Sequence, residues 1–192
     1  MTQTTVPSQI ANPQLNMIHH GHYRVDPVHT RVLFGISHFG LSTFFGEFTG
    51  ASGTLQIDPA KLAETMLDIS IPVDNIYTSS RILDEELKSV DWLDSRRYPT
   101  LRFQSRSTIP RDDGTLSVGG GLTLHGITKE IGLTVKFHGG GVNPVKDVYT
   151  IGFDVRGSAC RSDFGVMRQL PAIGDDLQLI IGAAFELVSQ GA

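Results

Sequence analysis

HTRVLFGISHFGLSTFFGEFTG, residues 29–50, carries five phenylalanines and interrupts them with glycine or small polar residues. Apolar side chains recur at every second position (Val32, Phe34, Ile36), and His38 continues the series. This period is typical of a β-strand with one apolar face. Glycine weakens a strand, so its place among so many aromatic residues needs a reason. We interpret the aromatic residues as the lining of a cavity and the glycines as points where the sheet bends around it.

The same alternation recurs along most of the chain and predicts an all-β fold. Alternating stretches cover residues 67–73, 101–109, 116–124, 131–137, 149–155 and 177–187. Turn-forming sequences separate several of them, at 111–114, 125–128 and 139–144. Short connections favour an antiparallel meander, and about eight such strands close into a barrel that leaves no exposed edges. A curled two-sheet sandwich is the alternative.

Several positions on the expected inner face carry small residues, namely Ser105, Ser107, Gly120 and Ala183. A barrel of about eight strands with small side chains inside can hold one apolar ligand. The sequence therefore favours a hollow barrel.

One helix interrupts the strands, at about residues 79–94. Thr78, Ser79 and Ser80 are candidate N-caps, and Leu83, Leu87 and Val90 follow on one face. We expect this insertion to lie over one opening of the barrel. It either plugs the core or forms a lid over a pocket.

Length, charge and hydropathy limit the class of protein. The chain has 192 residues and a net charge of −4, with its basic residues scattered, so nucleic-acid binding is not expected. No apolar run is long enough for a membrane helix. Residues 1–19 look like a flexible tail before one domain at 20–190, and they lack an export signal. We expect a cytoplasmic protein, or a periplasmic one if the natural start differs. Cys160 is expected in the core.

The candidate ligand-binding residues face the expected lumen from the strands, the insertion and the CRSDFG segment. They are Phe34, Ile36, His38, Phe45, Phe48, Leu83, Leu87, Trp92, Phe103, Phe153, Phe164 and Leu179. The choice of Phe45 over Phe44 depends on a bulge at Gly46. His38 is either a hydrogen-bonded core residue or a contact for the polar head of a ligand. We expect Arg161 to form an ion pair with Asp163 at a bend; the alternative is that it contacts the polar head of a ligand.

Motifs of common enzymes are missing, including the Gly-x-Ser-x-Gly elbow, the phosphate-binding glycine loop and the His-Glu-x-x-His zinc helix. The sequence therefore predicts no catalytic residue, no metal and no cofactor other than a bound isoprenoid-like lipid.

Five stretches in order resemble the YceI-like family. They are YRVDPVHTRVLFGISHFGLSTFFGEFTGASGTL, LDEELKSVDWLDSRRYPTLRFQS, VGGGLTLHGITKEIGLTVKFHG, IGFDVRGSACRSDFG and DDLQLIIGAAFEL. The resemblance runs from about His22 to Leu187. It implies a lipocalin-like barrel that sequesters a long apolar molecule, and a homodimer. Glu86 stands where the family's helix often has histidine.

The leading hypothesis is a non-catalytic carrier of a polyisoprenoid, an isoprenoid quinone or a fatty acyl amide. The alternative is an enzyme that acts on a lipid or quinone in the same barrel, with His38 and Asp84 as acid–base pair. A third is an interaction domain whose barrel is solid.

Overall fold

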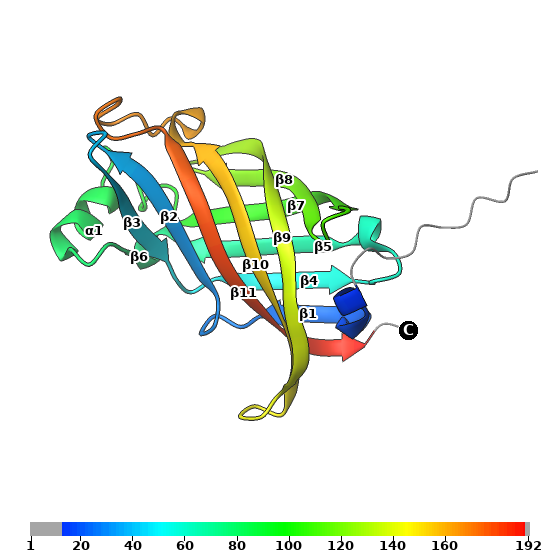
Figure 1. The fold of residues 1–192 in the computed structure, drawn as a ribbon. Coiled ribbons are helices and arrows are strands. Elements are labelled where there is room, and N and C mark those ends of the chain that lie inside the picture. Colours follow the sequence, from blue (N-terminus) through cyan, green and yellow to red (C-terminus); the bar gives the residue numbers. More distant parts are fainter. Residues whose placement is uncertain (1–12, 191–192) are drawn as a thin grey trace, which may run out of the picture.

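The computed structural model describes residues 13–190, and their strands form one closed antiparallel barrel of eight strands (Figure 1). The predicted all-β fold is confirmed. Its strand segments are β1 (Gly21–Val25), β2 (Arg31–His38), β3 (Ser42–Phe48), β4 (Ser52–Ile57), β5 (Met66–Pro72), β6 (Ile76–Tyr77), β7 (Thr100–Pro110), β8 (Leu116–Leu124), β9 (Ile127–Asn143), β10 (Val148–Cys160) and β11 (Asp176–Gln190).

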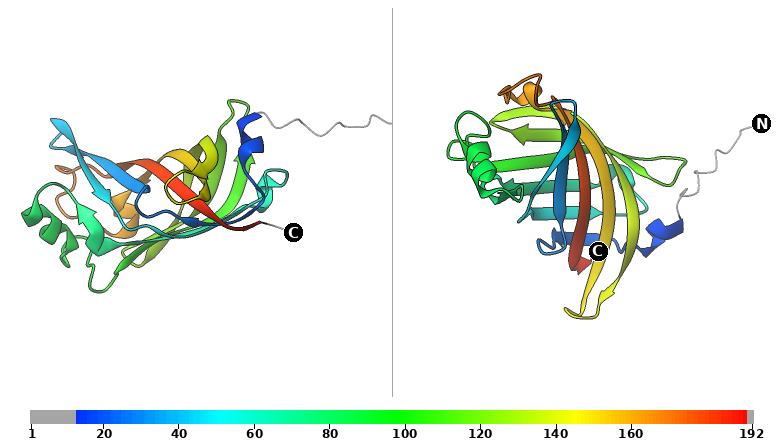
Figure 2. Two further views of the ribbon diagram at one scale, coloured as in Figure 1. Left: turned by 90° about the horizontal axis from the view of Figure 1, so that it is seen from below. Right: turned by 60° about the vertical axis from the view of Figure 1, so that its left-hand side comes forward.

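Three of the eight strands are bent, and each bent strand appears as two segments. β1 and β2 both pair with β11. On their other edges, β1 pairs with β4 and β2 pairs with β3. β5 and β6 then pair with β4 and β3. From β7 to β11 every strand pairs with the next, and the β1–β11 pairing closes the ring. The chain is therefore an up-and-down meander, and Figure 2 shows its strands curling around one interior.

The first bend, between β1 and β2, is held to β11 by one backbone hydrogen bond and by the Thr30 side chain. The Asp26 amide donates to the Ala184 carbonyl at 2.9 Å. The Thr30 hydroxyl donates to that carbonyl at 3.3 Å and accepts from the Ala184 amide at 3.1 Å. Thr30 is only 4% exposed. Its side chain thus satisfies backbone groups of the half-buried Ala184 that the interrupted strand does not reach.

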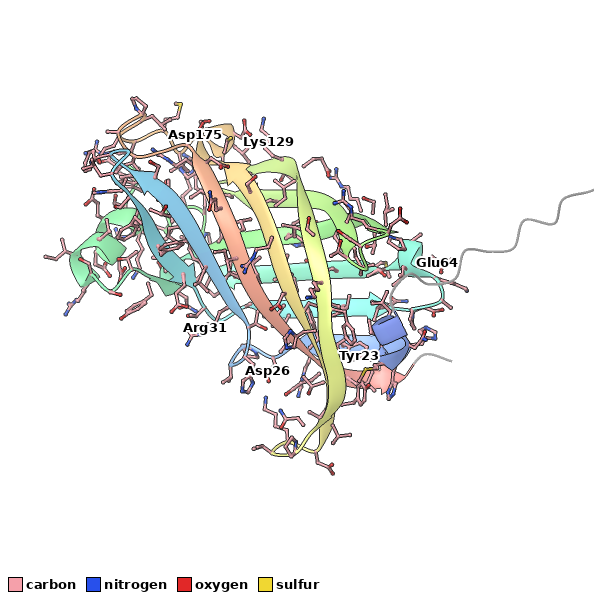
Figure 3. All side chains as sticks on the ribbon, viewed as in Figure 1. Tyr23, Asp26, Arg31, Glu64, Lys129 and Asp175 are labelled. Atoms are coloured by element: carbon pink, nitrogen blue, oxygen red, sulfur yellow. The ribbon has the colours of Figure 1, made fainter. Side chains whose placement is uncertain are left out.

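Charged side chains cross-link this bend, where Figure 3 labels Asp26, to the β9–β10 hairpin. Lys146 Nζ lies 2.9 Å from the Asp26 carboxylate and 2.6 Å from that of Glu186, and both carboxylates are buried. Arg24 also contacts Glu186, and His29 Nδ1 lies 2.7 Å from Asp26. Burial alone would raise the pKa of Asp26, but hydrogen bonds from Lys146 and His29 hold this pKa far below its usual value. The Lys146 hydrogen bond likewise lowers the pKa of Glu186.

The helical insertion is shorter than predicted. Helix α1 covers Arg81–Lys88, and the chain continues through turns to β7. Ser80 is the N-cap, because its hydroxyl accepts from the Leu83 amide at 3.4 Å. The helix lies beside β6 at one end of the barrel, as Figure 1 shows.

The chain before β1 packs on the barrel at the other end. Residues 1–12 of the predicted tail lie outside the described residues. The 3-10 helix η1 (Pro13–Met17) is followed by Ile18, which is buried like Leu15. The buried Tyr23 hydroxyl donates to the His19 carbonyl at 2.8 Å, and burial raises the pKa of Tyr23 to about 12. The part of the expected tail that the structure describes is therefore not a tail.

Two further expectations about strands are corrected. Residues 139–141, three glycines expected in a turn, continue β9, and the hairpin turn follows Asn143. Cys160, expected in the core, is exposed at the end of β10. No helix within residues 13–190 is long and apolar enough to cross a membrane.

Candidate functional site

The barrel encloses a cavity of about 500 Å³, within the range of small-molecule binding sites. Its wall is almost entirely apolar and is built from inward-facing side chains of the strands and of the α1 region. Many of these, including Phe34, Phe103 and Leu122, are only partly buried although they point into the barrel. The interior is therefore hollow, which contradicts the solid barrel of the third hypothesis.

Most of the predicted ligand-binding residues line this cavity. Those in its wall are Phe34, Ile36, His38, Phe48, Leu83, Leu87, Trp92, Phe103, Phe153 and Leu179. That they bind a ligand stays a prediction, but their common location is observed.

Phe45 and Phe164 do not line the cavity, so the prediction of their location was wrong. Phe45 is 52% exposed on the outer face, and its neighbour Phe44 lines the cavity instead. The register of β3 against β2 is uninterrupted, without the bulge that would turn Phe45 inward. Phe164 is 1% exposed and packs in the core, where its carbonyl lies 3.1 Å from His125 Nδ1.

The glycines of the opening stretch make room for aromatic rings. Gly46 lies directly across from Phe34, and a Cβ there would overlap the Phe34 ring. On the outer face Gly35 lies across from Phe45, whose Cε1 would be 2.9 Å from a Cβ at that position. Each ring thus covers the glycine on the facing strand. Gly50, with φ of +73°, is the glycine that serves the bend between β3 and β4.

Side chains of the α1 region cover one end of the cavity. Leu83, Leu87 and Trp92 contribute to its wall there. The segment is fixed by Asp84, whose buried carboxylate accepts from the Thr78 amide at 2.8 Å and the Thr78 hydroxyl at 2.6 Å. These hydrogen bonds join the helix to the end of β6. The α1 region therefore forms part of the cavity wall, which is the position expected of a lid over a pocket.

Arg161 is a buried cation in the cavity wall near the same end. Its guanidinium donates to four backbone carbonyls, of Gly174, Val166, Arg168 and Ile173, at 2.8–2.9 Å. It also lies 5.5 Å from the centre of the Trp92 ring. Burial lowers the pKa of Arg161. The predicted ion pair with Asp163 does not form, and the side chain instead braces the whole loop between β10 and β11.

The cavity reaches the surface beside α1, where exposed Glu86 and Gln169 belong to its wall. The Trp92 indole donates to the Glu86 carboxylate at 3.1 Å, so this glutamate positions the tryptophan. His38 lines the same end and packs against the rings of Phe39 and Phe44.

The catalytic alternative finds no support in this geometry. Asp84 is not in the cavity wall, and its carboxylate is engaged by Thr78. The hydrogen bonds within the described residues do not join it to His38. Among the same residues no group of three His, Cys, Asp or Glu side chains is arranged to hold a metal ion.

A small polar region at the opposite end was missed from the sequence. A bulge at Arg106 in β7 reverses the alternation after Ser105, so Ser107 and Ile109 face outward and Thr108 faces the cavity. Thr65, just before β5, also lines the cavity. Bulges leave little trace in the period of the apolar residues, although the adjacent Gly119–Gly121 run was a signal of irregular pairing.

Comparisons with known proteins agree with the fold. The model of the YceI-like domain matches residues 23–185. Protein YceI of Escherichia coli O157:H7 is 31% identical over 161 residues, which cover 83% of each chain.

Two solved structures have the same fold. Burkholderia cenocepacia BcnA superposes with a TM-score of 0.75 at 22% identity, over 83% of this chain and 98% of BcnA. A polyisoprenoid binding domain from Saccharophagus degradans superposes with a TM-score of 0.61 at 12% identity, over 86% of this chain and 98% of that domain.

Proposed function

The chain belongs to the YceI-like family, and we propose that it sequesters a long-chain apolar molecule inside its barrel without acting on it chemically. The observation that carries this proposal is the cavity of about 500 Å³ with an apolar wall. A polyisoprenoid, an isoprenoid quinone or a fatty acyl amide fits such a site. The Saccharophagus degradans domain of the same fold binds the first of these classes.

Burial of hydrocarbon is sufficient to hold such a ligand. About fifteen buried methylene groups contribute roughly 12 kcal/mol at about 0.8 kcal/mol each. An association cost of about 4 kcal/mol, at the low end of its range, leaves about 8 kcal/mol. This corresponds to a Kd of about 1 μM. The site therefore needs few polar contacts for affinity.

The position of Asp84 supports a carrier over the enzyme of the alternative hypothesis, because its carboxylate is bound by Thr78 outside the cavity wall. Asp84 is used to attach the helix, and the wall of the cavity is almost entirely apolar. A carrier whose ligand is released unchanged needs only the wall and an opening. Transport and storage differ in whether the protein passes this ligand on to another molecule.

Extraction of the purified protein tests the proposal. Protein isolated from its native host without detergent is extracted with organic solvent, and the extract is analysed by mass spectrometry. One apolar compound of near one-to-one stoichiometry, chemically unchanged after incubation with the protein, is expected. An extract without such a compound, together with no binding of added prenols or fatty amides, would contradict it. The predicted homodimer is tested on the same sample by sedimentation.

A further inference from the structure

The turn between β2 and β3 carries two exposed apolar side chains beside the opening of the cavity. Phe39 and Leu41 in this turn are 55% and 85% exposed, and neither belongs to the cavity wall. The centre of the Phe39 ring lies 4.3 Å from that of His38, which does line the cavity. The Phe39 amide donates to the Ala172 carbonyl at 2.7 Å, which joins the turn to the loop between β10 and β11. Figure 1 shows both segments at the end of the barrel where α1 lies.

The backbone of this turn makes phenylalanine an unfavourable residue. Phe39 and Gly40 have φ values of +54° and +68°, and the Leu41 amide closes the turn by donating to the His38 carbonyl at 3.0 Å. Turns with two successive residues of positive φ prefer Asn-Gly, because a bulky side chain is strained in this conformation. Phe39 is therefore costly both for its backbone and for its exposed ring. A large apolar side chain in such a position indicates a surface that contacts another molecule.

The sequence around Phe39 and Leu41 favours a partner without charge. Between Arg31 and Glu47 the chain has no Asp, Glu, Lys or Arg. The turns at the opposite end of the barrel differ, because residues 111–113 and residues 146–147 carry charged side chains in each. Burial of the β2–β3 turn in an apolar environment thus removes no ionic side chain from water. The hydrocarbon of a lipid bilayer is such an environment.

The proposed ligand also leads to a bilayer as the partner. A chain of about fifteen methylene groups prefers hydrocarbon to water by roughly 10⁹-fold. Nearly all of such a ligand therefore resides in membranes, and a carrier has to collect or deliver it at a membrane surface. An apolar turn that inserts beside the opening joins the cavity to the bilayer, so that the ligand passes between them without a step through water.

We propose that the β2–β3 turn inserts into the surface of a lipid bilayer, with Phe39 and Leu41 among the acyl chains and the opening of the cavity facing the hydrocarbon. This inference rests on the proposed function for the ligand that is exchanged, and it adds the membrane as partner and the turn as contact surface. Two inserted side chains give a weak and reversible attachment. Anionic lipids are not required, because the turn offers no Lys or Arg to them.

Flotation of the protein with vesicles tests the contact. Vesicles of phosphatidylcholine alone should bind the wild type at both low and high salt. Leu41→Gln and Phe39→Asn are each expected to weaken this binding about tenfold, because each removes one buried apolar side chain. Val145→Gln, at a 91% exposed position in the β9–β10 turn, is the matched control and should bind as the wild type does. Three results would overturn the inference: no binding by the wild type, equal binding by both variants, or binding that requires added phosphatidylglycerol and is lost at high salt.

Uptake of a fluorescent polyene probe separates this inference from the proposed function. Both variants should bind the probe in solution as the wild type does, because neither residue lines the cavity. They should take the same probe from phosphatidylcholine vesicles about tenfold more slowly, in proportion to their weaker attachment. Asparagine tolerates positive φ, so Phe39→Asn should be no less stable in urea than the wild type, which excludes unfolding as the cause. Equal uptake from vesicles by all three proteins would overturn the inference, whereas no binding of the probe by the wild type in solution would overturn the proposed function itself.

Discussion

Filling the cavity is the perturbation that separates a hollow barrel from a packed one. Ala183 on β11 lies across from Phe153, and its small side chain belongs to the cavity wall. The variant Ala183→Phe puts a ring where a ligand would lie. That ring occupies the room of about six chain carbons, and at about 0.8 kcal/mol per methylene group their loss costs the ligand about 5 kcal/mol. If most of the ligand's chain moves to another part of the cavity, about 2 kcal/mol of this lost binding free energy remains. That loss raises Kd about 30-fold.

The same variant should leave the protein as stable as before. A ring added to open apolar space gains contacts, whereas a ring forced into a packed core costs about 1–3 kcal/mol. Binding is measured by displacement of a fluorescent polyene probe, and the free energy of unfolding by urea denaturation. Val188→Phe, an exposed position on the same strand, is the control and should change neither quantity. A loss of stability together with unchanged binding would refute the reasoning, because the interior would then be packed and the ligand bound elsewhere.

Three further substitutions test how the barrel is held. Thr30→Val should lower the free energy of unfolding by about 0.5–1.5 kcal/mol in urea, because it removes the hydrogen bond between the Thr30 hydroxyl and the half-buried Ala184 amide. Gly46→Ala should cost about 1–3 kcal/mol in the same assay, since the new methyl group displaces the Phe34 ring. Lys146→Met should flatten the dependence of stability on pH between pH 7 and pH 3, measured by urea denaturation at each pH.

The sign of the pH effect follows from the two buried carboxylates that Lys146 contacts. Their pKa values in the folded protein lie below the usual values of about 4, so their contribution to stability is complete above that range and is lost as the pH falls. Parallel pH curves for wild type and variant would contradict this.

Gly139→Ala is the control for the glycine substitution, because no described atom lies within 4 Å of a Cβ there, and it should be nearly neutral.

The period of the apolar residues was sufficient to predict the barrel and most of its lining. On an uninterrupted strand the period fixes the inner face, which is why Phe34, Phe103 and Leu179 were placed correctly. It fails wherever the register changes, because one extra residue turns every later side chain to the other face. The bulge at Arg106 therefore turned Thr108, and not Ser107 or Ile109, to the cavity side of β7, which the period of the apolar residues did not reveal.

Other errors came from interactions between distant parts of the chain. Arg161 was predicted to pair with Asp163 because the two residues are close in sequence. In the structure its guanidinium instead donates hydrogen bonds to backbone carbonyls of the loop that follows. Leu15 and Ile18 lie in a segment without periodicity and are buried by the barrel surface they meet. The glycines were predicted to lie where the sheet bends. Gly46 instead leaves room for the ring of Phe34 on the facing strand, and only the pairing register reveals this contact.

The most direct measurement is an electron-density map of crystals grown from protein that was purified from its host without removal of lipid. We predict continuous elongated density inside the barrel, along its apolar wall to the ring of Trp92. Wall side chains meeting across the axis, or density for separate water molecules alone along its full length, would contradict the claim that this barrel is a container for an apolar chain.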